Sequence, residues 1–251
     1  MLVIIESLAT RPDLLDAALG LGDIGYEFMQ HDPVASLTRV ARLATRWPEY
    51  FLLVLDQGVP VARAVSIPMA FPTNQRTELP DHGWDGAILW ATEDALDGRT
   101  PTTLTALDVQ VATDRRGQGI AAQALAALRA CAVAHGLNRL VIPVRPTEKQ
   151  HQPDETMQDY LRRRRSDGYS SDSWLRTHER AGARIVKVAP FAMTITGTLT
   201  QWEKWTGKPL QSGPNIVDGA LVPVLASVEQ NLGIYVEPNV WVEHPIAATK
   251  S

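Results

Sequence analysis

A short glycine-containing segment carries the clearest chemical signal of the sequence. It reads Arg116-Gly117-Gln118-Gly119-Ile120-Ala121 and comes directly before an alanine-rich run with helical spacing. The first turn of a helix leaves backbone N–H groups unpaired, and the helix dipole favours an anion there. Glycine lets the backbone approach a ligand without a Cβ in the way, and Arg116 adds a positive charge. The segment therefore predicts a phosphate-binding loop.

Proteins that bind dinucleotides use one kind of glycine loop. The spacing Gly117-x-Gly119-x-x-Ala122 formally matches the dinucleotide fingerprint of a Rossmann unit. That fingerprint needs an apolar strand running into the first glycine and an acidic ribose ligand after the next strand. Here the next predicted strand ends in Arg145, so a dinucleotide is the weaker interpretation.

A strand, a helix and a second strand must position this loop. Residues 103–111 are predicted to form a strand, residues 119–135 a helix that ends at Gly136, and residues 139–144 a nearly continuous apolar strand. Such a crossover within about 40 residues joins two parallel strands.

The remaining segments alternate between strand and helix periods. Strands are predicted at residues 2–6, 51–55, 59–68, 183–195, 221–228 and 234–241, and helices from residue 11, over 33–47, over 172–182 and over 198–205. Residues 71–102 are rich in Pro, Gly, Asp and Thr and are expected to form a long ordered loop. One mixed α/β sheet in a single domain is the simplest arrangement.

Composition limits the classes of function. The chain has 251 residues, 45% of them hydrophobic, and a formal net charge of -4, which argues against a dedicated nucleic-acid binder. Cys131 is the only cysteine and the six histidines show no ligand spacing, so we expect no disulfide and no metal. No run approaches the ~20 apolar residues of a membrane span, and the first residues lack a signal-peptide pattern. We therefore expect a cytoplasmic protein with no membrane partner.

The glycine loop and its flanking strand together resemble one family. Arg116-x-x-Gly119-x-Ala121 is similar to the Arg/Gln-x-x-Gly-x-Gly/Ala acyl-CoA pyrophosphate loop of the GCN5-related N-acetyltransferase (GNAT) superfamily. Leu107-x-Val109-x-Val111 precedes it, as the pantetheine-binding strand does in that family. The order of elements is similar over most of the chain, whereas the motifs are similar only in residues 104–145 and 174–183.

The resemblance implies a fold and a co-substrate. The fold would be α/β (α+β), a strongly twisted mixed sheet with helices on both faces and two parallel strands that splay apart in the middle. Residues 1–251 would form one domain with insertions at about 71–102 and 146–173 and a C-terminal extension at about 196–251. Acetyl-CoA, or another acyl-CoA, would bind with its pantetheine arm on backbone groups of Val109 and Val111 and its pyrophosphate on backbone N–H groups of residues 116–121.

The resemblance also implies groups that move protons. The usual acid of the family is a Tyr four residues before the glycine that ends the helix after the second splayed strand; His178 stands there, before Gly182. A histidine serves this purpose near neutral pH, although it also packs or caps at helix ends. Asp108, in the first splayed strand, is a candidate general base if its face meets the acceptor, and an ordinary strand residue otherwise. Glu237 is a weaker candidate of the same kind.

Three functions follow from these residues. The leading interpretation is an acyl-CoA-dependent N-acyltransferase that acetylates a small-molecule amine by direct attack. Thr147 follows the second splayed strand, and together with His178 it resembles the site of GNAT-like decarboxylase domains, so decarboxylation or S-acyl transfer of a malonyl thioester is the alternative. Capping of the next segment is the structural explanation of Thr147. The third interpretation is a non-catalytic CoA-binding module. A homodimer is left open, because the C-terminal hairpin offers an edge for pairing.

Overall fold

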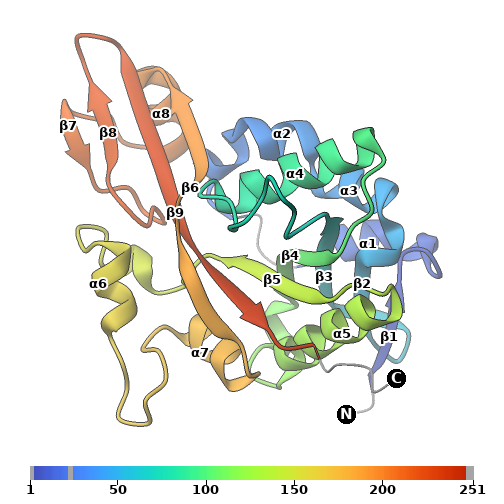
Figure 1. Ribbon diagram of the computed structural model, residues 1–251. Helices are drawn as coiled ribbons and strands as arrows, with labels where there is room; N and C mark the ends of the chain where they lie inside the picture. The colour runs from blue at the N-terminus through green and yellow to red at the C-terminus, as the bar shows by residue number, and fades with distance from the viewer. Residues whose placement is uncertain (1–2, 22–24, 247–251) are drawn as a thin grey trace.

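A single twisted sheet organises the molecule (Figure 1). The computed structural model describes residues 3–21 and 25–246. Within them the sheet has the order β1-β2-β3-β4-β5-β9-β8-β7, and β6 pairs with the opposite edge of β9. The strands are β1 (Ile4–Ser7), β2 (Phe51–Asp56), β3 (Val59–Met69), β4 (Thr103–Val111), β5 (Arg139–Val144), β6 (Arg184–Gly197), β7 (Gly213–Asn215), β8 (Val224–Ser227) and β9 (Leu232–His244).

Helices lie on both faces of this sheet. Helix α5 packs against β2–β5 on one side, whereas α1–α4 lie on the other (Figure 1). The helices are α1 (Leu15–Leu19), α2 (Pro33–Thr38), α3 (Val40–Arg46), α4 (Gly83–Asp97), α5 (Ile120–Ala134), α6 (Met157–Arg162), α7 (Ser173–Arg180) and α8 (Leu199–Thr206). Short 3-10 turns are η1 (Pro12–Leu14), η2 (Glu27–His31), η3 (Pro48–Tyr50), η4 (Thr113–Arg115) and η5 (Lys149–His151). Among the described residues, none of the helices has the length and hydropathy of a membrane-spanning segment.

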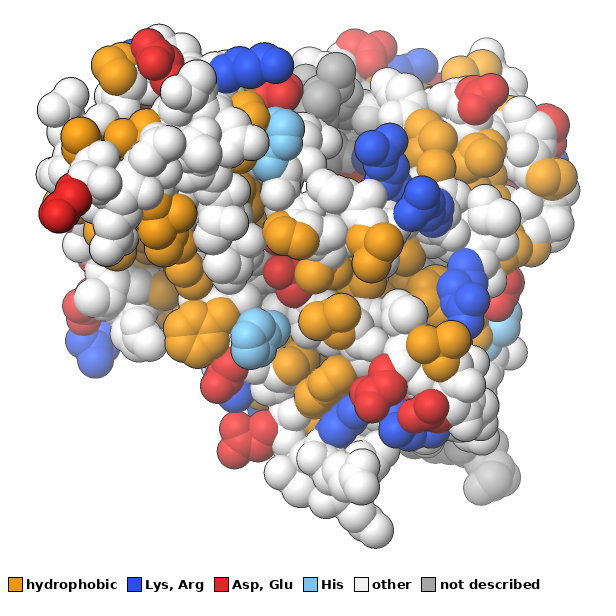
Figure 2. All heavy atoms as spheres, turned by 90° about the horizontal axis from the view of Figure 1, so that it is seen from above, with side chains coloured by type: hydrophobic (Ala, Val, Ile, Leu, Met, Phe, Trp, Pro, Cys, Tyr) orange, Lys and Arg blue, Asp and Glu red, His pale blue; other side chains and the backbone are white. Residues whose placement is uncertain are grey.

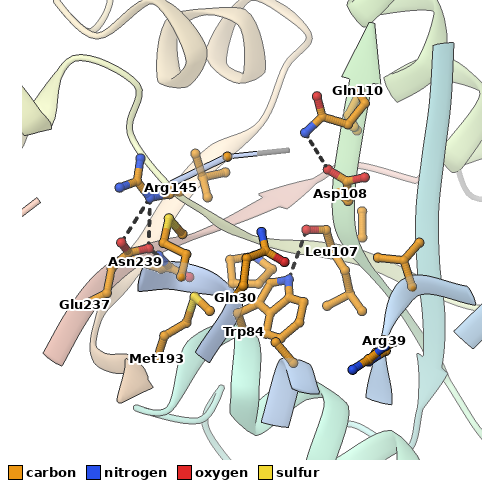
Figure 3. Close-up of a pocket in the computed structure, with 18 of the residues that line it drawn as sticks. Gln30, Arg39, Trp84, Leu107, Asp108, Gln110, Arg145, Met193, Glu237 and Asn239 are labelled. Atoms are coloured by element: carbon orange, nitrogen blue, oxygen red, sulfur yellow. Dashed lines mark hydrogen bonds and ion pairs between the residues drawn. The ribbon is translucent and has the colours of Figure 1, made fainter. Parts of the chain in front are cut away.

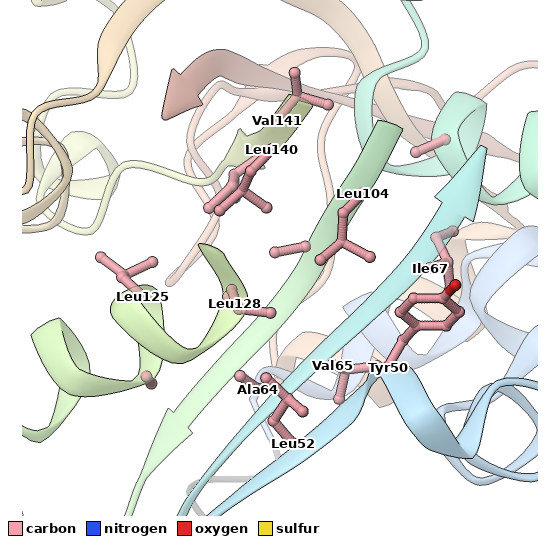
Figure 4. Close-up of a cluster of buried hydrophobic side chains, with 14 of the residues drawn as sticks. Tyr50, Leu52, Ala64, Val65, Ile67, Leu104, Leu125, Leu128, Leu140 and Val141 are labelled. Atoms are coloured by element: carbon pink, nitrogen blue, oxygen red, sulfur yellow. The ribbon is translucent and has the colours of Figure 1, made fainter. Parts of the chain in front are cut away.

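The predicted strand–helix–strand unit is confirmed. Strands β4 and β5 have the predicted bounds and run parallel, and α5 connects them. Leu125 and Leu128 of α5 are fully buried against Leu104 of β4 and Leu140 of β5 (Figure 4). Burying each leucine contributes about 1.5–3 kcal/mol, so this face of α5 fixes the loop at its N-terminus relative to the sheet.

Other predicted elements agree with the structure near their expected bounds. The hairpin of β2 and β3, the strands β6 and β9, and α7 form where the sequence predicts them. Thr198 caps α8 through a reciprocal capping box with Gln201. The predicted strand at residues 2–6 is found at Ile4–Ser7, and residue 2 lies outside the described residues. The mixed sheet with helices on both faces is the predicted fold class.

The expected loop at residues 71–102 is wrong, because it contains the helix α4. Gly83 starts that helix and suggests a loop in sequence, but it serves close packing instead. A Cβ at Gly83 would lie 2.6 Å from the Cβ of Ala192 in β6. The glycine therefore lets α4 press against the sheet, which is a tertiary requirement that local sequence does not reveal.

The predicted helix over residues 33–47 is in fact two helices. It breaks at Arg39, whose φ of 27° lies in the left-handed region, and α2 and α3 meet there. Asp32 starts α2 by accepting a hydrogen bond from the backbone N–H of Ala35 (2.7 Å).

The C-terminal segments have a hydrophobic cluster of their own. Trp202 of α8 and Tyr235 of β9 are fully buried there, together with Phe28 from η2. Phe28 lies with its ring centroid 5.3 Å from that of Tyr235. This cluster joins an N-terminal segment to the end of the chain, next to the point where β4 and β5 separate.

Candidate functional site

A cavity of about 940 Å³ opens where β4 and β5 separate. The two strands pair only through Thr103, Leu104 and Thr105 of β4, so the rest of each strand leaves a gap. Residues 106–110 line one side of it and residues 142–145 the other. Pro143 cannot donate a ladder hydrogen bond, which suits a strand that has lost its neighbour on one side. Ligand sites of roughly 300–1,000 Å³ are typical, so the cavity is large enough for two substrates to meet.

The cavity extends between elements that are far apart in sequence (Figure 3). Walls come from η2, α2, α3 and α4 on one side of the sheet and from α7, β6 and β9 beyond β5. Besides residues 106–110 and 142–145 it is lined by Leu19, Gly25, Met29, Gln30, His31, Ala35, Ser36, Arg39, Val40, Ala41, Arg63, Trp84, Trp174, Met193, Glu237 and Asn239.

The register of β4 directs its odd-numbered backbone groups into the gap. The N–H of Ala112 donates to the carbonyl of Val61 in β3 (2.9 Å). Backbone groups alternate in direction along a strand, so the N–H and C=O of Val109 and Val111 point away from β3 and toward β5. This is the orientation that the predicted pantetheine contacts require, and Val109 also lines the cavity.

A β-bulge marks the middle of β4. Val65 of β3 pairs with Asp108 and Ser66 pairs with Ala106, which leaves Leu107 as the extra residue. Its carbonyl accepts a hydrogen bond from Nε1 of Trp84 in α4 (3.1 Å; Figure 3). Bulges re-aim backbone groups next to active sites, and here α4 holds the bulge in place.

The loop after β4 has the geometry of an anion cradle. Gly117 and Gly119 have φ values of 76° and 80°, and Gly119 is the N-cap of α5. A Cβ built at either glycine would meet no atom within 4 Å, and residues 116–119 are exposed. The first turn of α5 leaves N–H groups without helical partners, and the exposed loop before it leaves room for an anion there.

Asp108 lies in the cavity, at the bulge. Its Oδ2 accepts from Nε of Arg63 (2.8 Å) and its Oδ1 from Nε2 of Gln110 (3.1 Å). Arg63 is itself fixed by the carbonyls of Ala18 and Leu19 at the end of α1. The Asp108 side chain thus lies on the face of the sheet that α1–α4 cover, opposite α5. Its role as base stays a prediction.

Glu237 also lines the cavity, but its carboxylate is already engaged. Both oxygens accept from Nε of Arg145 (3.0 Å each), and Oε2 accepts from the Tyr235 hydroxyl (2.8 Å). Burial lowers the pKa of the Arg145 guanidinium, but the nearby Glu237 outweighs it and the pKa is raised. Arg145 also donates to the carbonyl of Gly219. This network fastens the end of β5 to β9 and to the C-terminal cluster.

Two further carboxyls lie behind the cavity wall. Asp32 and Asp85 are buried at the starts of α2 and α4, each next to a cavity-lining residue. Burial is the larger cause that raises the pKa of Asp85, and the neighbouring Asp32 is the second. Together they raise it to about 8. Asp85 therefore carries the proton at pH 7.

His178 lies one side chain away from the cavity. It is fully buried in α7, with Nδ1 2.9 Å from Nε2 of His244 in β9. Burial lowers the pKa of His178 to about 3 and that of His244 to about 4, so both rings are neutral at pH 7. Trp174 packs edge-on against His178 and lines the cavity, whereas His178 does not. Its role as acid stays a prediction.

Thr147 is exposed after β5 and does not line the cavity either. Of the three predicted catalytic residues, the structure thus places only Asp108 there. Arg39 and Trp84 line the cavity but are not among the predicted site residues. Glu237, the weaker candidate base named from the sequence, does line the cavity. Within the described residues no group of three or more His, Cys, Asp or Glu could hold a metal ion.

Comparisons with known proteins show which proteins this chain resembles. No family model matches the chain. Arginine N-acetyltransferase avaD of Aspergillus versicolor is 33% identical over 278 residues, which cover 96% of this chain and 93% of that protein.

Among solved structures, the loading GNATL domain of CurA from Lyngbya majuscula has a TM-score of 0.61 at 15% identity, covering 98% of both chains. The GphF GNAT-like decarboxylase in complex with isobutyryl-CoA has a TM-score of 0.53 at 17% identity, covering 97% of this chain and 99% of that one. At these identities the two structures establish the fold alone.

Proposed function

The chain belongs to the GCN5-related N-acetyltransferase superfamily, and from this premise we propose that it transfers the acetyl group of acetyl-CoA to a nitrogen of arginine. The relative that is 33% identical over nearly its whole length is an arginine N-acetyltransferase. The observation that carries the proposal is the cavity between β4 and β5, which reaches Gln110 of β4, the strand that leads into the glycine loop, and has the charged side chains of Asp108, Arg145 and Glu237 in its lining.

Acetyl-CoA would enter along the gap. The N–H groups of residues 116–121 suit its pyrophosphate, and the backbone groups of Val109 and Val111 suit the amides of its pantetheine arm. This arrangement brings the thioester to the bulge at Leu107. The N–H of Val109 would then donate to the thioester oxygen, where negative charge develops.

The acceptor would approach from the side of α1–α4. Its neutral nitrogen attacks the thioester carbon, forms the C–N bond, and passes a proton to Asp108 directly or through water. The tetrahedral intermediate then collapses, the C–S bond breaks, and CoA leaves as a thiolate. Asp108 releases its proton to water, and water protonates the thiolate. Arg63 and Gln110 hold the Asp108 carboxylate at the bulge for this transfer.

We interpret the described chain as one domain whose added segments build the acceptor side. The segment at about 71–102 supplies α4 and Trp84. The C-terminal extension at about 196–251, as far as residue 246, supplies Glu237 and Asn239. The segment at about 146–173 supplies the approach to α7.

The malonyl alternative has less support. It requires Thr147 and His178 at the acyl carbonyl, and neither lines the cavity. Acetyl transfer to an amine requires a base near the thioester at the bulge, and Asp108 lies there.

The test is to incubate the protein with acetyl-CoA or malonyl-CoA, with arginine and a panel of other amines, and to follow products by mass spectrometry. We expect acetylarginine and an equal amount of free CoA. Carbon dioxide from malonyl-CoA without any acetylated amine would support decarboxylation and overturn the proposal.

A further inference from the structure

Arg39 is a cation of the cavity that none of the mechanism uses. It stands at the junction of α2 and α3, on the side of the cavity away from Arg145 and Glu237 (Figure 3). Its side chain is exposed, and within the described residues its guanidinium makes no hydrogen bond and no ion pair. An arginine that lines a cavity without a partner has its full set of donors available to a ligand.

The backbone at Arg39 is also unusual. Its φ of 27° is unfavourable for a residue with a side chain, and glycine or asparagine would adopt it more easily. Strained backbone persists where the surrounding structure enforces it, and such positions gather at ligand sites. Here the capped start of α2 and the packing of α3 against β3 hold the junction, so the guanidinium is presented from a fixed point.

The charges of the cavity leave one position unbalanced. Arg63 is paired with Asp108, and Arg145 is paired with Glu237. Among the described residues, Arg39 therefore leaves the lining with one positive charge that no carboxylate offsets. A ligand that brings an anionic group to this place would complete the balance.

Resting on the proposed function, we propose that Arg39 binds the carboxylate of the acceptor, so that the substrate class is a free amino acid of the arginine type. A planar guanidinium matches a carboxylate with two parallel hydrogen bonds. The phosphates of CoA are the other anions available, but Arg39 lies on the α1–α4 side of the sheet, whereas the phosphate loop leads into α5 on the other. Figure 2 shows several Lys and Arg side chains on the face seen from above, interspersed with hydrophobic and acidic side chains, so no single charge sign covers this face.

The first experiment needs no variant. Steady-state rates are compared for arginine, for argininamide, whose carboxylate is replaced by a neutral amide, and for agmatine, which lacks the group. We expect kcat/KM to be about 10- to 100-fold higher for arginine, because hydrogen bonds to a charged group are worth that much. Equal values for the three acceptors overturn the inference while the proposed function stands.

The second experiment assigns the effect to one side chain. Arg39→Gln keeps a side chain at the strained position and removes the charge, so the preference for arginine over argininamide is expected to fall to near unity. The CoA affinity is expected to stay unchanged. A loss of CoA affinity with the arginine preference intact would assign Arg39 to a phosphate and overturn the inference.

Arg42→Gln is the matched control, because Arg42 is exposed three residues later and already donates to the carbonyl of Leu37. It is expected to keep the arginine preference. Calorimetric titration of arginine and argininamide into the enzyme–CoA complex gives a readout without turnover. If none of the three compounds is acetylated, the proposed function fails; the titration then still decides whether Arg39 binds a carboxylate.

Discussion

The two halves of the cavity are built in different ways. The half assigned to CoA comes from one continuous stretch, β4, the glycine loop, α5 and β5, and it presents mainly backbone groups. The half assigned to the acceptor presents side chains from separate parts of the chain, namely Gln30, Arg39, Trp84, Asp108, Met193 and Glu237. Backbone groups suffice to bind a co-substrate that many enzymes share. Recognition of a particular acceptor requires side chains that only the complete fold brings together.

The largest effect is expected in the acceptor half, from Asp108→Asn. An amide cannot take the proton of the attacking nitrogen, so kcat should fall by about 10²- to 10⁴-fold while the CoA affinity stays unchanged. Rapid-quench or steady-state kinetics with arginine measure this. Asp114→Asn, an exposed carboxylate on the loop that follows β4, is the control and should keep wild-type kcat. Normal turnover by Asp108→Asn would remove Asp108 from the mechanism.

The next effect is expected in the CoA half, from Gly119→Val. A branched side chain at a φ of 80° is strained and covers the first turn of α5, so CoA should bind about 10- to 100-fold more weakly. Gly98→Val is the matched control, because Gly98 ends α4 at a φ of 66° and has no neighbour within 4 Å of an added Cβ. It should lose comparable stability and keep the CoA affinity measured by calorimetry. Equal CoA binding by both variants would show that the loop does not hold the phosphates.

A smaller effect concerns the histidines just outside both halves. The unfolded chain takes up protons near pH 6.5, whereas His178 and His244 stay neutral in the fold down to about pH 3 and 4. The unfolded state therefore binds more protons in this window, and stability should fall as the pH is lowered through it, by about 1.4 kcal/mol per pH unit for each histidine.

Denaturant unfolding at a series of pH values measures this slope. His178→Gln should make it shallower and leave kcat for arginine close to the wild-type value at pH 7, because His178 is not in the cavity. A large loss of kcat with an unchanged pH slope would instead support His178 as the acid.

The smallest effect is expected where the two halves meet. Trp84→Phe removes the hydrogen bond to the carbonyl of Leu107, which is worth about 0.5–1.5 kcal/mol. Because the bulge serves both substrates, kcat/KM should fall about 2- to 10-fold for acetyl-CoA and for arginine alike. Trp90→Phe, on the same helix but stacked against Phe71, is the control and should change neither. If kcat/KM fell for only one of the two substrates, the bulge would serve only the half of the cavity that binds that substrate.

The same contrast explains which features the sequence could predict. The strand–loop–helix–strand unit could be predicted because its signals are local: alternation in residues 103–111, two glycines, an apolar face in α5 and a capping glycine at 136. The backbone conformation of Gly117 and Gly119 follows from the lack of a side chain.

The acceptor side could not be predicted to the same extent, because its geometry depends on contacts between distant segments. Gly83 suggests a loop until Ala192 of β6 is placed against it. Arg39 looks like any residue of a regular helix, since nothing local indicates the break there. Glu237 can be named from the sequence as a carboxylate within a predicted strand, but only the fold pairs it with Arg145.

A crystal structure of the enzyme with both CoA and arginine bound is the decisive experiment. We expect pantetheine between β4 and β5, the pyrophosphate on residues 116–121, and arginine in the cavity on the α1–α4 side with a nitrogen facing the CoA sulfur beside Asp108. Arginine bound outside this cavity, or CoA that does not follow the gap between the two strands, would contradict this expectation.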